Sequence, residues 1–185
     1  MIFVSFRRQG CLTSKHSNNN RYGCATLQII IANESHFEIL LELFKELDDY
    51  HYPLAPDRIR KYSERSRSEE QLRAYIEGED RILFLAKMEN EYVGFINIRT
   101  EFINGNHLQR KRKLCLLDNA YVKEPYRKQG VSSKLLDSVR TWCRERNISK
   151  IELQVFSSNS TAVAFYTAMG FEVFTYRMEL NVDIK

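Results

Sequence analysis

Two short stretches of this chain combine residue types that bind anions and transfer protons. The first, residues 121–132, leads from an apolar, strand-like segment into an amphipathic helical pattern. Gly130 therefore stands at a predicted helix N-terminus, where the first amides lack partners within the helix and the dipole is positive. Such amides can hold a phosphate or pyrophosphate, and Arg127 and Lys128 add positive charge at the mouth of the loop. An ordinary turn before a helix is the alternative.

The second stretch, residues 159–171, predicts a helix that begins at an Asn or Ser cap and ends at Gly170. Asn159 and Tyr166 are seven residues apart, or two helical turns, so they project from the same side. A tyrosine there is a candidate proton donor. The alternative, which the tyrosine taken alone favours, is a half-buried core aromatic whose hydroxyl finds a partner.

Two common nucleotide-binding patterns are missing from the sequence. No G-x-x-x-x-G-K-[ST] loop and no G-x-G-x-x-G run occur, which argues against nucleotide hydrolysis of the usual kind and against nicotinamide binding.

Together, in this order and at this separation, the two stretches resemble the GNAT superfamily of N-acetyltransferases, and the resemblance covers about residues 27–180. Residues 127–132 fit the acyl-CoA loop of that family, Q/R-x-x-G-x-G/A, except that Ser132 replaces the last small residue. The second stretch matches the family pattern N-x-x-A-x-x-[FY]-Y-x-x-x-G-F through Asn159, Ala162, Phe165, Tyr166, Gly170 and Phe171.

The resemblance implies that acetyl-CoA is the cosubstrate and lies where strand 114–122 separates from strand 149–155. Its pyrophosphate is expected on the loop amides, and its pantetheine arm beside the backbone at the end of the first strand. Tyr166 is then the expected general acid for the leaving thiolate. The residues expected to contact acetyl-CoA are Tyr121, Val122, Arg127, Lys128, Gln129, Gly130, Val131, Ser132, Asn159 and Tyr166.

The attacking amine must lose a proton, and Asp118 is the candidate base, since it stands four residues before Val122 on the strand beside the thioester. Strand alternation puts Asp118, Ala120 and Val122 on one face. A structural or solvent-facing carboxylate is the alternative role for Asp118, and ordered water is the alternative proton acceptor.

The elements that must position these residues alternate along the chain and predict an α/β fold with a mixed, partly parallel sheet in the order β-α-α-β-β-β-α-β-α-β. Residues 1–25 are expected to be a flexible leader, and residues 26–185 a single N-acetyltransferase domain. Strands are predicted at 27–32, 81–88, 91–101, 114–122, 149–155 and 171–180, and helices at 34–49, 57–77, 131–146 and 160–169.

Charge and composition narrow the function further. The chain has 185 residues and a net charge of +4, and the whole excess lies in residues 1–25, so the rest is neutral. A neutral body argues against a dedicated nucleic-acid binder. The widely spaced Cys11, Cys24, Cys115 and Cys143 suggest reduced thiols rather than a metal site or disulfides. No apolar run reaches the length of a membrane span, so a soluble, cytoplasmic protein is expected.

The sequence therefore predicts an enzyme that transfers an acetyl group from acetyl-CoA to a primary amine of a small molecule or a protein. The alternative is a catalytically silent acyl-CoA sensor or interaction module. Asp48 and Asp49, beside three aromatic residues, are candidates for receiving a cationic amine, and the alternative is ordinary solvated carboxylates at a helix end. The basic residues 110–113 favour a solvated loop or an acidic partner. The edge strand predicted at 171–180 is a candidate homodimer contact.

Overall fold

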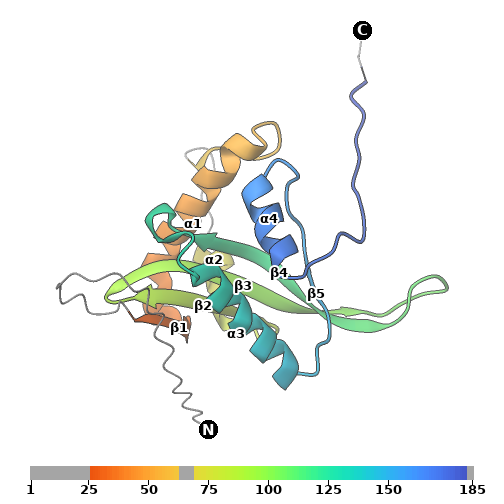
Figure 1. Cartoon of the computed structure of the whole chain (residues 1–185). Helices are drawn as coiled ribbons and strands as arrows, with labels where there is room; N and C mark the ends of the chain where they lie inside the picture. Colours follow the sequence, from red (N-terminus) through yellow and green to blue (C-terminus); the bar gives the residue numbers. More distant parts are fainter. Residues whose placement is uncertain (1–25, 63–68, 183–185) are drawn as a thin grey trace, which may run out of the picture.

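Five strands form one sheet in the order in which they occur in the chain (Figure 1). The computed structural model describes residues 26–62 and 69–182. Neighbouring strands from β1 to β4 pair antiparallel, and β5 pairs parallel with β4. The strands are β1 (Leu27–Ile31), β2 (Arg81–Met88), β3 (Glu91–Ile103), β4 (Arg112–Val122) and β5 (Ile151–Leu153).

Helices cover both faces of this sheet. Helices α1 and α2 pack on one face, and α3 packs on the other across β1 to β4. The helices are α1 (Phe37–His51), α2 (Glu69–Glu77), α3 (Val131–Glu145) and α4 (Ser160–Ala168), with short 3₁₀ turns η1 (Glu34–His36), η2 (Tyr52–Leu54) and η4 (Glu124–Tyr126).

The core beneath α1 follows directly from helical spacing. Leu40, Leu43, Phe44 and Leu47 recur at intervals of three and four residues, and each is at most 1% exposed. The Phe44 ring contacts Phe95 of β3 with 4.5 Å between centroids. This face fixes α1, and with it the polar residues at the end of α1, against the sheet.

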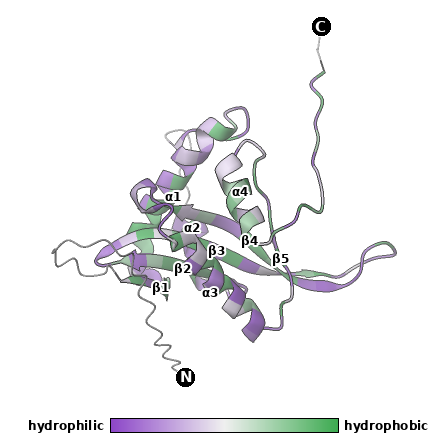
Figure 2. Cartoon of the chain, viewed as in Figure 1, coloured by the Kyte–Doolittle hydropathy of each residue, from purple (hydrophilic) through white to green (hydrophobic). Residues whose placement is uncertain are grey.

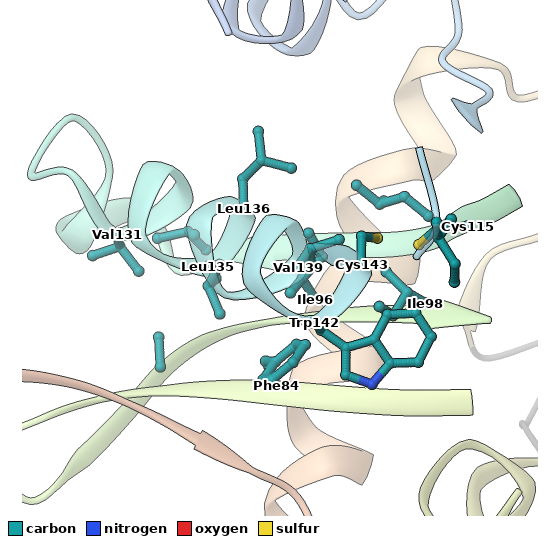
Figure 3. Packing of buried hydrophobic residues seen from close by; sticks show 14 of the residues in the cluster. Phe84, Ile96, Ile98, Cys115, Val131, Leu135, Leu136, Val139, Trp142 and Cys143 are labelled. Carbon is teal, nitrogen blue, oxygen red and sulfur yellow. The ribbon is translucent and has the colours of Figure 1, made fainter. Parts of the chain in front are cut away.

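The other core lies between α3 and the sheet. Figure 3 shows Val131, Leu135, Val139 and Trp142 along α3 above the strands. These four side chains are at most 7% exposed, and Cys143 packs among them as a free, buried thiol. Figure 2, coloured by hydropathy, shows hydrophilic residues along the β3–β4 hairpin, which extends beyond the rest of the sheet.

Most predicted elements are confirmed, with boundaries within a few residues. The hairpin of β2 and β3 turns at Glu89, whose φ is +54°. Of the helix predicted at 57–77, only Glu69–Glu77 is helical, and residues 63–68 lie outside the described part of the chain. Strand β5 covers three residues of the seven predicted.

The strand predicted at 171–180 is wrong. No backbone hydrogen bond joins residues 172–182 to another described residue, and this segment runs away from the body beside α4 (Figure 1). The sequence has the alternation of a strand, but a strand also needs an edge to pair with, and the chain does not turn back to its own β5.

The leader predicted at residues 1–25, with Cys11 and Cys24, lies outside the described residues. Within residues 26–62 and 69–182, no helix combines the length and the apolar character needed to cross a bilayer.

Candidate active site

Strands β4 and β5 separate soon after they meet. Their parallel pairing joins only residues 115–117 to residues 151–153. Residues 119–122 of β4 continue to pair with β3, while their other edge pairs with no described strand. The result is a wedge with free backbone groups on the β4 side, where an extended ligand can add like a strand.

A β-bulge marks the point of separation. The register between β3 and β4 shifts at Asp118, which has no partner residue on β3. Ala120 and Val122 pack toward α3, whereas the Asp118 carboxylate accepts a hydrogen bond from Arg99 Nε at 3.1 Å. Ile98 of β3 packs toward α3, so its neighbour Arg99 points to the opposite face of the sheet. Asp118, which is bonded to Arg99, therefore also lies on the face opposite α3. The prediction that Asp118 shares a face with Ala120 and Val122 is therefore wrong, because the bulge breaks the alternation.

A buried polar pair adjoins the bulge on β3 and β4. Asn119 Nδ2 donates to Asn97 Oδ1 at 2.9 Å, and Asn97 is only 1% exposed. The Nδ2 of Asn97 has no partner among the described residues, which leaves an unused donor beside the bulge.

The N-terminus of α3 opens beside the end of β4. Gly130 precedes it with φ +82°, and no side chain of the described residues caps the first turn. A Cβ placed on Gly130 would meet nothing within 4 Å, so the chain is not crowded at this position. Lys128 also has positive φ, +61°. Successive amides in such a loop converge on one concavity suited to an anion.

The side chains of this loop divide into two groups. Arg127 turns back to the end of β4, where its Nε donates to the Val122 carbonyl at 2.9 Å, so it does not add charge at the mouth of the loop as expected. Gln129 Nε2 donates to the Pro125 carbonyl at 2.8 Å and braces the turn. Lys128 is exposed and is the cationic side chain left for an anion.

Glu91, at the start of β3, holds the same loop in place. It accepts hydrogen bonds from the Tyr126 hydroxyl at 2.6 Å and from Lys123 Nζ at 2.9 Å. The Tyr126 hydrogen bond, followed by Lys123, lowers the pKa of Glu91. The loop is thus tied to the sheet on the side away from the wedge.

Tyr50 links three of the predicted site residues. Its hydroxyl donates to Asn159 Oδ1 at 3.3 Å, and the Arg127 guanidinium lies 4.7 Å from its ring centroid. The same guanidinium lies 5.7 Å from the ring of Tyr121. Asn159 is 7% exposed, and its Oδ1 also accepts from the Ala162 amide at 3.1 Å, which makes it the N-cap of α4.

Glu46 is a site residue that the sequence reasoning missed. Its Oε2 accepts from the Tyr121 hydroxyl at 3.1 Å. Burial, followed by the nearby Glu46 charge, raises the pKa of Tyr121 to about 12. The available signal was the spacing of Glu46 and Tyr50, four residues apart on one face of α1.

The ring of Tyr166 lies between the ring of Phe165 on α4 and the ring of Phe171, which follows α4. Its ring contacts Phe165 and Phe171 edge to face, with centroids 5.3 and 5.4 Å away. Its hydroxyl forms no hydrogen bond with another described residue. Burial raises the pKa of Tyr166 to about 12. The structure therefore offers a protonated phenol with an unused donor.

The two acidic residues expected to receive an amine lie in different environments on α1. Asp48 is buried, with 6% exposed, whereas Asp49 is exposed to solvent. The basic residues 110–113 lie at the far hairpin of β3 and β4 (Figure 1).

Comparison with known proteins identifies the class. The model of the acetyltransferase (GNAT) family matches residues 40–171, so this chain belongs to that family. It is 31% identical over 98 residues to streptothricin acetyltransferase A of Bacillus subtilis, a match that spans 53% of this chain and 51% of that relative. The chain thus spans about half the length of the curated relative.

Solved structures show the same fold. A mutant of the BH1408 protein from Bacillus halodurans has a TM-score of 0.79 at 20% identity, covering 84% of this chain and 99% of that one. AAC(6')-Iy, solved in complex with a bisubstrate analogue, CoA-S-monomethyl-acetylneamine, has a TM-score of 0.64 at 17% identity, covering 86% of this chain and 100% of that one.

The raised pKa of Tyr166 predicts an unusual alkaline titration. A difference titration of tyrosinate absorbance between the natural chain and Tyr166→Phe should have its midpoint near 12, since burial disfavours the charged phenolate. Because the folded pKa exceeds the ordinary value of about 10, the stability that neutral Tyr166 contributes is complete below pH 10 and is lost as the pH rises through 12. A midpoint near 10 would contradict the burial of this side chain.

Proposed function

We propose that this protein transfers an acetyl group from acetyl-CoA to a primary amine of a small molecule or of a protein. The wedge between β4 and β5 carries the proposal, because it meets the uncapped N-terminus of α3 at Gly130. An extended thioester-bearing arm and an anionic pyrophosphate each find matching backbone groups there. Family membership supports acetyl transfer as the reaction.

The residues present suit acetyl-CoA as the donor. The amides of residues 130–132 would hold the pyrophosphate, and exposed Lys128 would add a positive charge. The backbone of Tyr121 and Val122 would lie along the pantetheine arm, although the Val122 carbonyl must share or give up its bond to Arg127. Gln129 stabilises the loop through its hydrogen bond to the Pro125 carbonyl, and the buried Val131 packs the start of α3 into the core. The CoA-containing ligand of AAC(6')-Iy supports this donor through the shared fold.

In the proposed reaction the neutral amine nitrogen attacks the thioester carbonyl and forms the new N–C bond. The tetrahedral intermediate then collapses, the C–S bond breaks, and the thiolate takes a proton from the Tyr166 hydroxyl. A phenol with a pKa of about 12 stays protonated at neutral pH, so Tyr166 retains the proton that it is proposed to donate. Burial would raise the pKa of the CoA thiol as well, so the pKa values of the thiol and of the Tyr166 phenol would differ less than their ordinary positions suggest.

Asp118 is the proposed acceptor of the amine proton. It is the residue directly after the paired part of β4, so it stands where the wedge begins. One carboxylate oxygen is bonded to Arg99, which orients the group and leaves its second oxygen for the amine.

Glu46 of α1 places a partly buried carboxylate, bonded to the Tyr121 hydroxyl, near the end of β4, and a carboxylate suits a cationic amine. The printed names of streptothricin acetyltransferase A and of the aminoglycoside N-acetyltransferase AAC(6')-Iy give streptothricin and an aminoglycoside as acceptors of those proteins, which supports a small amine acceptor here.

Replacing Gly130 with alanine should weaken acetyl-CoA binding at least tenfold by calorimetry. The new Cβ strains a position with φ +82°, and relief of that strain would move the amides that the pyrophosphate is proposed to contact. Gly170→Ala is the matched control, because Gly170 has φ +87° and equally open surroundings but lies after α4. Equal affinities of the two variants would contradict an anion site at Gly130.

Tyr166→Phe should lower kcat by about 10²- to 10⁴-fold, the usual contribution of general acid catalysis, with little change in acetyl-CoA affinity. The assay measures CoA thiol released in the presence of a panel of amines that includes streptothricin and aminoglycosides. Tyr176→Phe is the control, since Tyr176 is 84% exposed. Tight acetyl-CoA binding that no amine converts into thiol release would favour the silent sensor instead.

Asp118→Asn should lower kcat to a similar degree, and a small exogenous base such as formate or imidazole should restore part of the activity. Glu101→Gln is the control, because Glu101 is another carboxylate bonded to Arg99, at 2.8 Å. Equal losses in both variants, without rescue, would assign Asp118 a positioning role through Arg99.

A further inference from the structure

The hairpin that joins β3 to β4 reaches beyond the other strands of the sheet. The pairing of β2 with β3 ends at Arg99, and the pairing of β5 with β4 starts at Cys115. Past these residues, 101–103 pair with 112–114, and no other described strand lies beside them. Figure 1 shows the hairpin projecting from the body of the protein. Its side chains therefore face solvent rather than a core.

The turn of this hairpin is held by its own hydrogen bonds. Asn106 Oδ1 accepts from the amides of Leu108 and Gln109 at 2.8 and 2.9 Å, and the Asn106 amide donates to the Gln109 carbonyl at 2.9 Å. Gly105 has φ +74°, and a Cβ there would lie 2.7 Å from the Gln109 carbonyl oxygen, so this turn requires glycine. The hairpin thus has its shape before a ligand arrives, which lowers the entropic cost of binding.

Positive charge gathers on the hairpin. Residues 104–113 contain no acidic residue and four basic ones, Arg110, Lys111, Arg112 and Lys113. Within residues 26–62 and 69–182, Arg112 alone among these four forms an ion pair, with Glu152 at 3.7 Å. Zero net charge on the body argues against a nucleic-acid footprint across the whole surface. A local cluster still acts on phosphates that lie within the Debye length of about 10 Å.

The C-terminal end of α3 widens this cationic surface. Lys113 Nζ donates to the Arg146 carbonyl at 3.4 Å, so the end of α3 lies against the base of the hairpin. Lys150 directly precedes β5, which pairs with β4 beside the same base. Arg144, Arg146 and Lys150 are all exposed. Two segments that are distant in the sequence thus contribute cations to one end of the molecule.

Phe102 places an aromatic ring among these cations. It is 60% exposed, and Lys113 Nζ lies 5.4 Å from its ring centroid. Phe102 and Lys113 are directly opposite each other on β3 and β4, so they share a face of the hairpin. An exposed ring bordered by cations can stack on a base while the cations bind the neighbouring phosphates. A duplex stacks its bases on one another, and an acidic protein segment needs the cations alone, so the ring favours a single strand.

We propose that the β3–β4 hairpin and the adjoining end of α3 bind single-stranded nucleic acid. Phe102 stacks on a base, and Arg110, Lys111 and Lys113 contact phosphates. This surface is separate from the proposed acetyl-CoA site at the start of α3, because the 15 residues of that helix span about 22 Å. Both ligands can therefore be bound at the same time.

Fluorescence anisotropy on the full chain tests the proposal with a labelled single strand of about 12 nucleotides, prepared as RNA and as DNA. The logarithm of the affinity should fall against the logarithm of salt concentration with a slope of about −3, since about four phosphates are neutralised. A duplex of the same sequence should bind more weakly, and excess CoA should not displace the strand. Absence of binding, or displacement by CoA, would overturn the proposal.

Arg110→Gln with Lys111→Gln and Lys113→Gln should weaken binding of the single strand at least tenfold at low salt. The slope should become shallower by about 2, because three phosphate contacts are lost. Circular dichroism should match that of the natural chain, since the three side chains lie outside the hydrophobic cores.

Lys45→Gln with Arg60→Gln and Lys61→Gln is the matched control. It removes the same charge from exposed positions on α1 and after η2. Its affinity for the strand should stay close to that of the natural chain. Equal losses in the two triple variants would reduce the binding to net charge and would overturn the assignment to the hairpin.

The ring of Phe102 distinguishes nucleic acid from an acidic protein. Phe102→Leu should weaken binding of the single strand about tenfold and leave the salt slope unchanged, because the ring stacks but carries no charge. A polyglutamate peptide of equal charge should bind more weakly than the strand and should not respond to this substitution. Equal binding of both probes, with no effect of Phe102→Leu, would assign the surface to an acidic protein and would overturn the proposal.

Discussion

The short parallel contact between β4 and β5 is the constraint on which the site depends. Three residue pairs hold the strands together, and beyond them β4 stays with β3 while β5 diverges. Gly94 of β3 permits this arrangement, since a Cβ there would meet the Tyr121 carbonyl oxygen at 2.5 Å. Close packing of β3 on β4 leaves the opposite edge of β4 free, and the bulge at Asp118 lies where that free edge begins.

Helix packing then turns this wedge into a defined site. Because α3 buries one complete apolar face, its uncapped N-terminus cannot move away from the end of β4. On the other face, Tyr50 of α1 ties Asn159 and Arg127 together, so helix α1, the loop before α3 and the cap of α4 share one network. Catalytic groups gain precision from such support, since small displacements are costly in the transition state.

The open edge that creates the wedge on one side of β5 has a counterpart on the other. Among the described strands, β5 pairs with β4 alone. No side chain of α4 is fully buried, and the large apolar side chains of residues 173–182 are exposed. Tyr166, the proposed acid, is one of the partly buried residues of α4.

The sequence by itself determined the features that depend on local periodicity and local backbone preference. Neighbouring residues determine the apolar spacing of α1 and α3 and the turn at Glu89. They also determine that Gly130 precedes α3 and that Asn159 caps α4. Only the tertiary structure decided the face of Asp118, the inward turn of Arg127 and the unpaired state of residues 172–182. Each of these features depends on contacts with other parts of the chain. A bulge is a mismatch in the pairing of two strands, and the direction of a guanidinium depends on which acceptors lie near it. A strand forms only where the edge of another strand is available for pairing.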